Sequence, residues 1–319
     1  MTAGDLLERQ FQHEAMLYQG IDGFLAGTIP FLRNGIAAQE PILVLVDAPK
    51  TQALQGELGR DADRVKFADI AEVGRNPARI LPVWRRFVDD HLTPERAVRG
   101  VGEPIGAGRS PAELVECQAH ETLLNVAFAN GQGWSLLCPY DVSALDEDVV
   151  EEARRSHPML VTGGERMRSN SFVETHPSPA RLDAPLPPPP AEFEEFDFGP
   201  APSSLRLVRS RVARFAHRAG LGVTAVEHVV MAASELATNS IRYGGGRGTM
   251  RLWLTPDSVL CEFADRGRIT GPALLGREMP NVRQESGRGL WLVNQLCDLV
   301  QIRSGAMGTV IRLHMSRPA

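Results

Sequence analysis

The chain has 319 residues, of which 43% are hydrophobic and 23% are charged, and it carries a formal net charge of -5. This length suits two folded domains, and the composition predicts buried cores and excludes a chain that stays disordered. The acidic balance gives no electrostatic reason for direct binding to nucleic acid or to an anionic membrane.

The N-terminus and the cysteines predict where the protein resides. Asp5, Glu8 and Arg9 precede any apolar run, so the start of the chain does not resemble a signal peptide. No apolar stretch approaches the roughly 20 residues that a membrane-spanning helix needs. The four cysteines are widely spaced, which argues against a disulfide scaffold. We therefore expect a cytoplasmic protein.

The first half of the chain alternates strand-like and helix-like segments. We expect strands at 41–46, 65–69, 97–101 and 134–138, and helices near 77–91, 111–130 and 146–156. Such alternation predicts an α/β layer with a mostly parallel sheet. Neither a Gly-x-x-x-x-Gly-Lys-Ser/Thr loop nor a strand-linked Gly-x-Gly-x-x-Gly is present, so this half has no ordinary phosphate-binding loop.

Four short pieces of this half resemble the MEDS sensory domain of bacterial regulators. They are Phe11–Tyr18, Gly102-Glu103-Pro104, Cys138–Asp141 and His157-Pro158. The resemblance covers about residues 8–173 and implies a RecA-like layered α/β sensory domain, which we assign to residues 1–173.

The resemblance implies a sensory pocket lined by His13, Tyr18 and Glu103, but the sequence does not identify the ligand. Cys117 and His120 stand three residues apart in a helical segment, and Cys138 and His157 follow later. Nitrogen and sulfur ligands of this kind suit zinc or another metal ion. The alternative is a set of buried thiols and hydrogen-bonded histidines, because the paired Cys-x-x-Cys spacing is absent.

Prolines dominate residues 174–202, which include Pro185-Leu-Pro-Pro-Pro-Pro190. Proline favours extended polyproline II geometry, so we expect a semi-stiff linker here. Phe193, Phe196 and Phe198 are unusual in a linker, and we expect them to dock on one of the domains.

The last third predicts a second domain, residues 203–319. Ser203 is expected to cap a helix that ends at Gly220, and Thr224 with Glu227 has the spacing of a capping box before a helix that reaches Tyr243. Strands at 249–255 and 258–264, a helix at 289–297 and a hairpin of 299–303 with 309–315 follow. This order predicts an α/β sandwich with helices on one face of a mixed sheet.

Three segments of this domain resemble the N, G1 and G2 boxes of the GHKL (Bergerat-fold) ATPases, most closely those of the anti-sigma-factor serine kinases. They are Glu235-Leu-Ala-Thr-Asn-Ser-Ile-Arg-Tyr-Gly244, Asp265-Arg-Gly267 and Ser286-Gly-Arg-Gly-Leu-Trp-Leu-Val293. The resemblance implies a nucleotide site for ATP and Mg²⁺ in a Bergerat-fold α/β sandwich.

The resemblance also implies a role for each motif residue. Asn239 would coordinate Mg²⁺ and Glu235 would act as the general base. Asp265 would accept a hydrogen bond from the adenine amino group, and Gly267 would let the backbone approach the base. Gly287, Arg288 and Gly289 would face the phosphates at a helix N-terminus. Residues 268–286 would form a lid, with Ile269 in place of the second glycine of a fuller motif.

The two resemblances imply a signalling protein that regulates transcription, in the manner of stress-response switches. Such kinases bind a sigma factor in one state and phosphorylate a STAS-domain anti-sigma antagonist in another, and many are homodimers. The alternative is a non-catalytic regulator in which ATP orders a protein-binding surface. A histidine kinase is a weaker alternative, because His217 is not followed by the acidic residue usual after a phospho-acceptor histidine.

Overall fold

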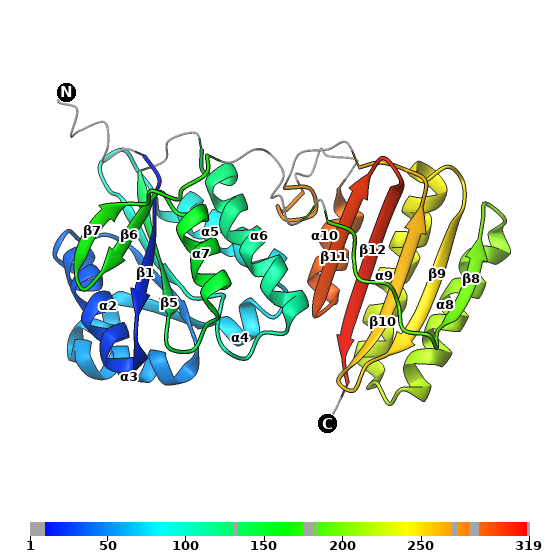
Figure 1. Cartoon of the computed structure of the whole chain (residues 1–319), viewed down its shortest axis with the longest axis horizontal. Helices are drawn as coiled ribbons and strands as arrows, with labels where there is room; N and C mark the ends of the chain where they lie inside the picture. The colour runs from blue at the N-terminus through cyan, green and yellow to red at the C-terminus, as the bar shows by residue number, and fades with distance from the viewer. Residues whose placement is uncertain are drawn as a thin grey trace. The chain divides into compact units, whose positions relative to one another are not determined.

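The computed structural model describes residues 10–129, 133–174, 182, 184–269, 274–280 and 287–317. The chain divides into two compact units, Met1–Pro177 and Ser178–Ala319 (Figure 1). Each unit has its own sheet and its own hydrophobic core. Among the described residues, no helix is both long enough and apolar enough to cross a lipid bilayer.

The first unit is built on a seven-stranded sheet with the strand order β3-β2-β4-β5-β1-β6-β7. The pairings between its described strands are parallel except in the hairpin of β6 and β7, which is antiparallel. Its strands are β1 (Gln12–Tyr18), β2 (Ile42–Val46), β3 (Val65–Asp69), β4 (Val98–Gly102), β5 (Trp134–Asp141), β6 (Met159–Thr162) and β7 (Glu165–Arg168). Its helices are α2 (Gly20–Ala37), α3 (Ala48–Leu58), α4 (Ile70–Val73), α5 (Ile80–His91), α6 (Pro111–Ala127) and α7 (Glu147–Ser156), with short 3-10 helices η1 (Gly59–Arg64) and η2 (Pro77–Arg79).

Helices cover both faces of this sheet, as a parallel sheet requires. Strand β2 is buried at every position, because one face packs against α5 and α6 and the other against α2 and α3. Trp84 of α5 fills the space over Gly100 and Gly102, where an added Cβ would lie 2.8 Å from the indole in each case. The predicted layered α/β fold is confirmed.

The second unit is a five-stranded sheet with helices on one face (Figure 1). Its strands are β8 (Glu194–Phe198), β9 (Gly248–Leu254), β10 (Ser258–Asp265), β11 (Leu299–Gly305) and β12 (Gly308–Ser316), in the order β11-β12-β10-β9-β8. Its helices are α8 (Pro202–Arg218), α9 (Val223–Tyr243) and α10 (Arg288–Leu296). The predicted α/β sandwich is confirmed, but every pairing between the described strands of this unit is antiparallel, so the expectation of a mixed sheet is wrong.

The caps of α8 and α9 also differ from expectation. The N-cap of α8 is Ala201, with Pro202 as the first helical residue, and the N-cap of α9 is Gly222. Neither helix has a side-chain cap, so Ser203, Thr224 and Glu227 do not serve as predicted. Proline at the first helical position loses no hydrogen bond, because that N–H has no partner within the helix.

Part of the expected linker belongs to the second unit. Strand β8 pairs with β9, so residues 194–198 extend the sheet. Phe198 is buried in the core and Phe196 packs against it, whereas Phe193 remains exposed. Alternate side chains of a strand face the same way, which explains why the phenylalanines two residues apart both reach the core.

The proline-rich segment before β8 is also attached to the second unit. The guanidinium of Arg312 donates to the carbonyl of Pro187 at 2.7 Å, and Nε of Arg303 donates to the carbonyl of Ala184 at 3.1 Å. Both arginines lie on the sheet, on β12 and β11. Residues 184–187 are therefore anchored on this unit and are not a free spacer.

Candidate functional site

Helix α9 brings the first motif to the edge of the core of the second unit. Its apolar side packs Val229, Ala233 and Leu236 into that core, as the helical period predicts. Glu235 and Asn239 lie one turn apart on the other side and are half-buried. Their positions are fixed because the opposite side of α9 is buried from Val226 to Ser240.

Gly289 of α10 lies directly against these two side chains. A Cβ added at Gly289 would lie 2.9 Å from Oε2 of Glu235 and 3.4 Å from Nδ2 of Asn239. The first and third motifs, about fifty residues apart in the sequence, therefore meet in space. Only a glycine allows this approach without displacing the carboxylate of Glu235.

Asp265, the last residue of β10, is held from two sides. Oγ of Ser240 donates to its Oδ2 at 2.6 Å, and the backbone N–H of Gly267 donates to its Oδ1 at 2.8 Å. Hydrogen bonds to a carboxylate are stronger than those between neutral groups, so they fix its orientation. Ser240 follows Asn239 on α9, so this helix links the second motif to the first. Ser240 lies inside the first motif, but the resemblance assigns it no role.

Gly267 occupies a tight turn beside the end of α9. A Cβ there would lie 2.5 Å from the carbonyl oxygen of Tyr243 and 2.8 Å from the Cα of Gly244, which are backbone atoms that cannot move aside alone. The carbonyl of Gly267 accepts a hydrogen bond from Oγ1 of Thr309 at 2.9 Å. Close backbone packing therefore requires glycine here, whatever ligand binds.

Ile269, at the position of the missing second glycine, is anchored in the fold. Its N–H donates to Oγ of Ser304 at 2.8 Å, and its side chain packs against the core. Of the expected lid, residues 270–273 and 281–286 lie outside the described residues. In the described part, the carbonyl of Gly276 accepts a hydrogen bond from Nδ2 of Asn294 on α10 at 2.8 Å.

The third motif forms the start of α10. Gly287 is its N-cap residue, with φ of 92°, a left-handed conformation that glycine adopts without strain. Arg288 is the first helical residue and is exposed, and Gly289 follows it. The first N–H groups of a helix have no partners within it and attract anions, and here they start beside Glu235 and Asn239.

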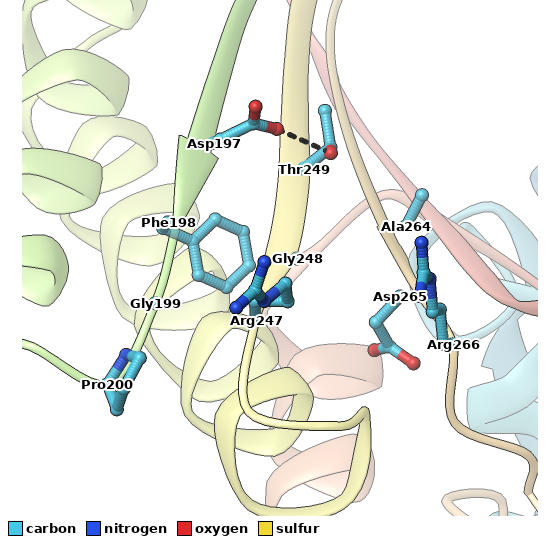
Figure 2. Close-up of a pocket in the computed structure, with 10 residues that line it drawn as sticks. All are labelled: Asp197, Phe198, Gly199, Pro200, Arg247, Gly248, Thr249, Ala264, Asp265 and Arg266. Atoms are coloured by element: carbon cyan, nitrogen blue, oxygen red, sulfur yellow. Dashed lines mark hydrogen bonds between the residues drawn. The ribbon is translucent and has the colours of Figure 1, made fainter.

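A cavity of about 360 Å³ borders Asp265 at the ends of β8, β9 and β10. Figure 2 shows Arg247 and Arg266 among the residues around it, and Asp197 accepting a hydrogen bond from Oγ1 of Thr249. Glu235 and Asn239 do not line this cavity. The carboxylate of Asp265 accepts a hydrogen bond from Ser240 of α9, so the cavity, on the strand side of Asp265, is separate from the residues of α9.

In the first unit, three of the predicted sensory residues meet in one buried cluster. We call His13, Glu121, Cys138 and His157 the His–Glu–Cys cluster, whose four ligand-type atoms all lie within 4.8 Å of one another. Glu121 was not predicted. It is four residues after Cys117 on α6 and so lies on the same side of that helix, facing the sheet.

Burial and charge shift the pKa values in this cluster. Burial, followed by the nearby charge of His157, lowers the pKa of His13 to about 4. Burial, with Glu121 adding to it, raises the pKa of the Cys138 thiol well above its usual range. Although burial alone would raise the pKa of Glu121, the imidazoles of His13 and His157 beside its carboxylate hold that pKa well below the usual range.

Tyr18 and Glu103 lie in a different place from His13. Since His13 and Tyr18 are five residues apart on β1, their side chains point to opposite faces and their Cα atoms are about 16 Å apart. The hydroxyl of Tyr18 donates to Glu103 at 2.6 Å, and Nζ of Lys50, a residue that sequence reasoning missed, lies 2.8 Å from the same carboxylate. The structure therefore does not bring His13, Tyr18 and Glu103 into one pocket.

Cys117 and His120 are buried on α6 but do not belong to the His–Glu–Cys cluster. The thiol of Cys117 donates to the carbonyl of Pro104 at 3.4 Å. A cavity of about 680 Å³ lies at the carboxyl end of β1, with Tyr18, Gly23, Gly27 and Arg154 among its lining residues. Ligands of open α/β sheets bind at this edge of the strands, so the cavity is the better candidate for a small-molecule sensory pocket.

Comparisons with known proteins agree with this division. Residues 12–158 match the family model of the MEthanogen/methylotroph, DcmR Sensory domain (MEDS), and residues 198–315 match that of the histidine kinase-like ATPase domain. No curated protein matches the chain. A crystal structure of the RsbU and RsbW domains of a Mycobacterium tuberculosis protein is similar with 22% identity and a TM-score of 0.31, over 41% of this chain and 34% of that one. This chain thus spans about a third of that structure. Each of the two units thus contains a region that matches a known family, the MEDS domain in the first and the histidine kinase-like ATPase domain in the second.

Proposed function

We propose that the C-terminal domain binds ATP with Mg²⁺ between α9 and α10. The observation that carries this proposal is that Glu235 and Asn239 of α9 lie against Gly289 of α10. The next residue of α9, Ser240, donates a hydrogen bond to Asp265. The end of α9 thus joins residues suited to a cation, to phosphates and to a nucleobase. The family match over residues 198–315 supports a nucleotide ligand.

Each of these residues has a chemical task in the proposed complex. The amide oxygen of Asn239 suits Mg²⁺, a hard cation that prefers oxygen ligands and would neutralise the phosphate charge. Gly287, Arg288 and Gly289 would hold the phosphates through N–H groups and one guanidinium at the start of α10. Asp265 has its orientation set by Ser240 and Gly267, and would accept a hydrogen bond from the adenine amino group.

We infer that the chemistry is phosphoryl transfer to a serine of a partner protein. Glu235 would accept a hydrogen bond from the serine hydroxyl and orient it toward the γ-phosphate. It would take the hydroxyl proton as the new oxygen–phosphorus bond forms and the bond from the γ-phosphorus to the β,γ-bridging oxygen breaks, with ADP as the leaving group. The packing of Gly289 against its carboxylate limits where that carboxylate can lie. Positioning is the main contribution a protein makes to phosphoryl transfer.

In the cell, the proposed role is that of a cytoplasmic anti-sigma factor and serine kinase, controlled by the N-terminal sensory domain. The partners would be a sigma factor and a STAS-domain antagonist that carries the target serine. The four cysteines are free thiols, which agrees with a reducing compartment. The second candidate is a regulator that binds ATP and grips a partner without catalysis. The half-buried Glu235 beside Gly289 favours the kinase, because a binding module does not need that carboxylate.

The test is phosphotransfer from γ-labelled ATP to a STAS-domain partner, measured beside ATP affinity. We expect Glu235→Gln to lose an acid-stable serine label and to keep ATP binding, and Asn239→Ala to weaken both. Glu227→Gln is the matched control, because Glu227 lies exposed on the same helix. Saturable ATP binding with no label in the wild type would favour the non-catalytic regulator. A label that survives Glu235→Gln would remove the assigned role of that carboxylate.

A further inference from the structure

The His–Glu–Cys cluster gathers its members from four different elements around one point. His13 lies on β1, Glu121 on α6, Cys138 on β5, and His157 directly follows α7. Each of the four residues is at most 1% exposed. Burying two imidazoles and a carboxylate is costly unless each polar atom has a partner, so the contacts inside the cluster determine what it can do.

The outer nitrogens of both histidines are held as hydrogen-bond donors. Nδ1 of His157 lies 2.8 Å from the carbonyl oxygen of Ala153, which can only accept. Nδ1 of His13 lies 3.0 Å from Oδ1 of Asn125, and the amide of Asn125 is oriented by its own donation to the carbonyl of Ser156 at 2.7 Å. Both rings, when neutral, therefore carry the proton on Nδ1 and point the lone pair of Nε2 into the cluster.

The atoms that face one another inside the cluster are consequently electron-pair donors. Oε2 of Glu121 lies 3.1 Å from Nε2 of His13 and 3.3 Å from Nε2 of His157, and Sγ of Cys138 lies 3.4 Å from Nε2 of His13. Among the described residues, Nε2 of His157 has no hydrogen-bond partner. Lone pairs at these separations repel one another unless a proton or a cation lies between them.

We propose that the His–Glu–Cys cluster is a binding site for a divalent transition-metal ion of the Zn²⁺ class. Two imidazoles and a thiolate select Zn²⁺-like ions over Mg²⁺ or Ca²⁺, which prefer oxygen ligands. In a tetrahedral zinc site with ordinary bond lengths, neighbouring ligand atoms lie about 3.3–3.6 Å apart. Three of the six separations in the cluster are already 3.1, 3.4 and 3.3 Å.

Charge balance supports the same assignment. A carboxylate at Glu121 and a thiolate at Cys138 together neutralise a divalent cation, while both histidines stay neutral. Binding would release the proton of the Cys138 thiol, since the thiolate is the metal ligand. Asn125 and Ala153 would act as the partners that orient the two imidazoles, an arrangement usual around metal-bound histidines.

Four protein ligands complete a tetrahedral shell, so this would be a closed site of the structural type and not a catalytic one. The ion would hold α6 and the corner between α7 and β6 to strands β1 and β5. Because His13 and His157 are 144 positions apart in the sequence, this one centre would tie together both ends of the sensory domain. Metal occupancy would therefore control how firmly that domain is folded.

The test is Co²⁺ and Zn²⁺ titration of the full chain after treatment with a chelator. Co²⁺ is the probe because thiolate coordination gives a charge-transfer band and tetrahedral geometry gives intense visible bands. We expect one ion per chain with both signals. Cys138→Ser should remove the thiolate band and weaken binding roughly a hundredfold or more, and Asn125→Ala should weaken it about 10- to 100-fold. Cys117→Ser is the matched control, a buried cysteine of α6 outside the cluster, and should bind as the wild type does.

The wild-type titration decides the question even if a variant fails to fold. Absence of stoichiometric binding by the folded wild-type chain would overturn the proposal and leave a hydrogen-bonded His–Glu–His cluster without metal. A thiolate band that survives Cys138→Ser, or that disappears in Cys117→Ser, would place the metal elsewhere and would also overturn it. Circular dichroism of each variant shows whether a loss of binding reflects unfolding.

Discussion

Replacing Gly289 by alanine should slow catalysis while it leaves the stability of the fold nearly unchanged. The new Cβ would lie 2.9 Å from Oε2 of Glu235, whereas ordinary contact begins at 3.4 Å, so that oxygen must retreat by about 0.5 Å. The displaced atom is the end of a flexible side chain, and its movement costs the fold little. Alanine also favours the helical conformation over glycine by up to about 1 kcal/mol. The free energy of unfolding should therefore stay within about 1 kcal/mol of the wild-type value.

The rate of phosphoryl transfer should fall more than the affinity for ATP in this variant. A misplacement of about 1 Å at a reacting group costs roughly a hundredfold in rate, so half of that predicts a loss on the order of tenfold. Nδ2 of Asn239 would lie at 3.4 Å from the new Cβ, an ordinary contact, so the affinity for Mg²⁺ and ATP should change less than the rate.

The assay combines thermal unfolding, ATP titration and initial rates of serine phosphorylation. Gly222→Ala is the matched control, because Gly222 is the N-cap residue of α9 and a Cβ there meets no atom within 4 Å. A wild-type rate in Gly289→Ala would show that catalysis does not depend on the position of the Glu235 carboxylate. A large loss of stability would refute the premise that only the carboxylate moves.

Three other substitutions test neighbouring parts of the account. Asp265→Asn removes a charged acceptor worth about 1.5–3 kcal/mol, so ATP should bind roughly 10- to 100-fold more weakly in an equilibrium titration, and an unchanged Kd would argue against its role at the nucleobase. Arg312→Met removes the closest partner of the buried Glu262 carboxylate, 2.6 Å away, and should lower the free energy of unfolding in denaturant by about 3 kcal/mol. A variant as stable as the wild type would contradict this prediction. Lys50→Met removes the ion pair with Glu103 and leaves Tyr18 as the remaining close partner of that carboxylate, so it should destabilise the sensory domain by about 3 kcal/mol. An effect no larger than that of Lys66→Met, a substitution of an exposed lysine, would show that the ion pair contributes little to stability.

The helices of the second domain could be predicted closely because the residue patterns that indicate them lie within each helix. The apolar stripe of α9 repeats with the helical period, and the helix ends at Tyr243 as expected. The start of α9 was predicted less well, because Thr224 and Glu227 have the spacing of a capping box although Gly222 is the cap. A cap depends on the conformation of one residue, and several nearby residues have the composition for it.

Strand β8 was missed for a different reason. Its alternation of Glu195 and Asp197 with Phe196 and Phe198 is a strand signal, but prolines surround it and favour the reading of a linker. The strand exists because β9 offers an edge for pairing and the core accepts Phe198. Tertiary contact of this kind leaves little trace in the local sequence.

The His–Glu–Cys cluster could be predicted only in part. The spacing of Cys117 and His120 indicated a ligand pair on α6, but the residue of α6 that belongs to the cluster is Glu121. His13 comes beside Cys138 because β1 lies next to β5, a neighbour relation that crosses more than a hundred residues. Neither helical period nor spacing carries that information, whereas the order of strands in the sheet supplies it.

The most direct test of the account is the Mg²⁺ dependence of ATP binding by the full chain, compared between the wild type and Asn239→Ala. If ATP lies between α9 and α10 with Asn239 on the metal, Mg²⁺ will tighten ATP binding by the wild type, and the variant will lose that gain while it keeps the metal-independent part. Glu227→Gln should behave as the wild type. No binding of ATP by the wild type, or a Mg²⁺ effect that is the same in Asn239→Ala, would contradict the proposed site.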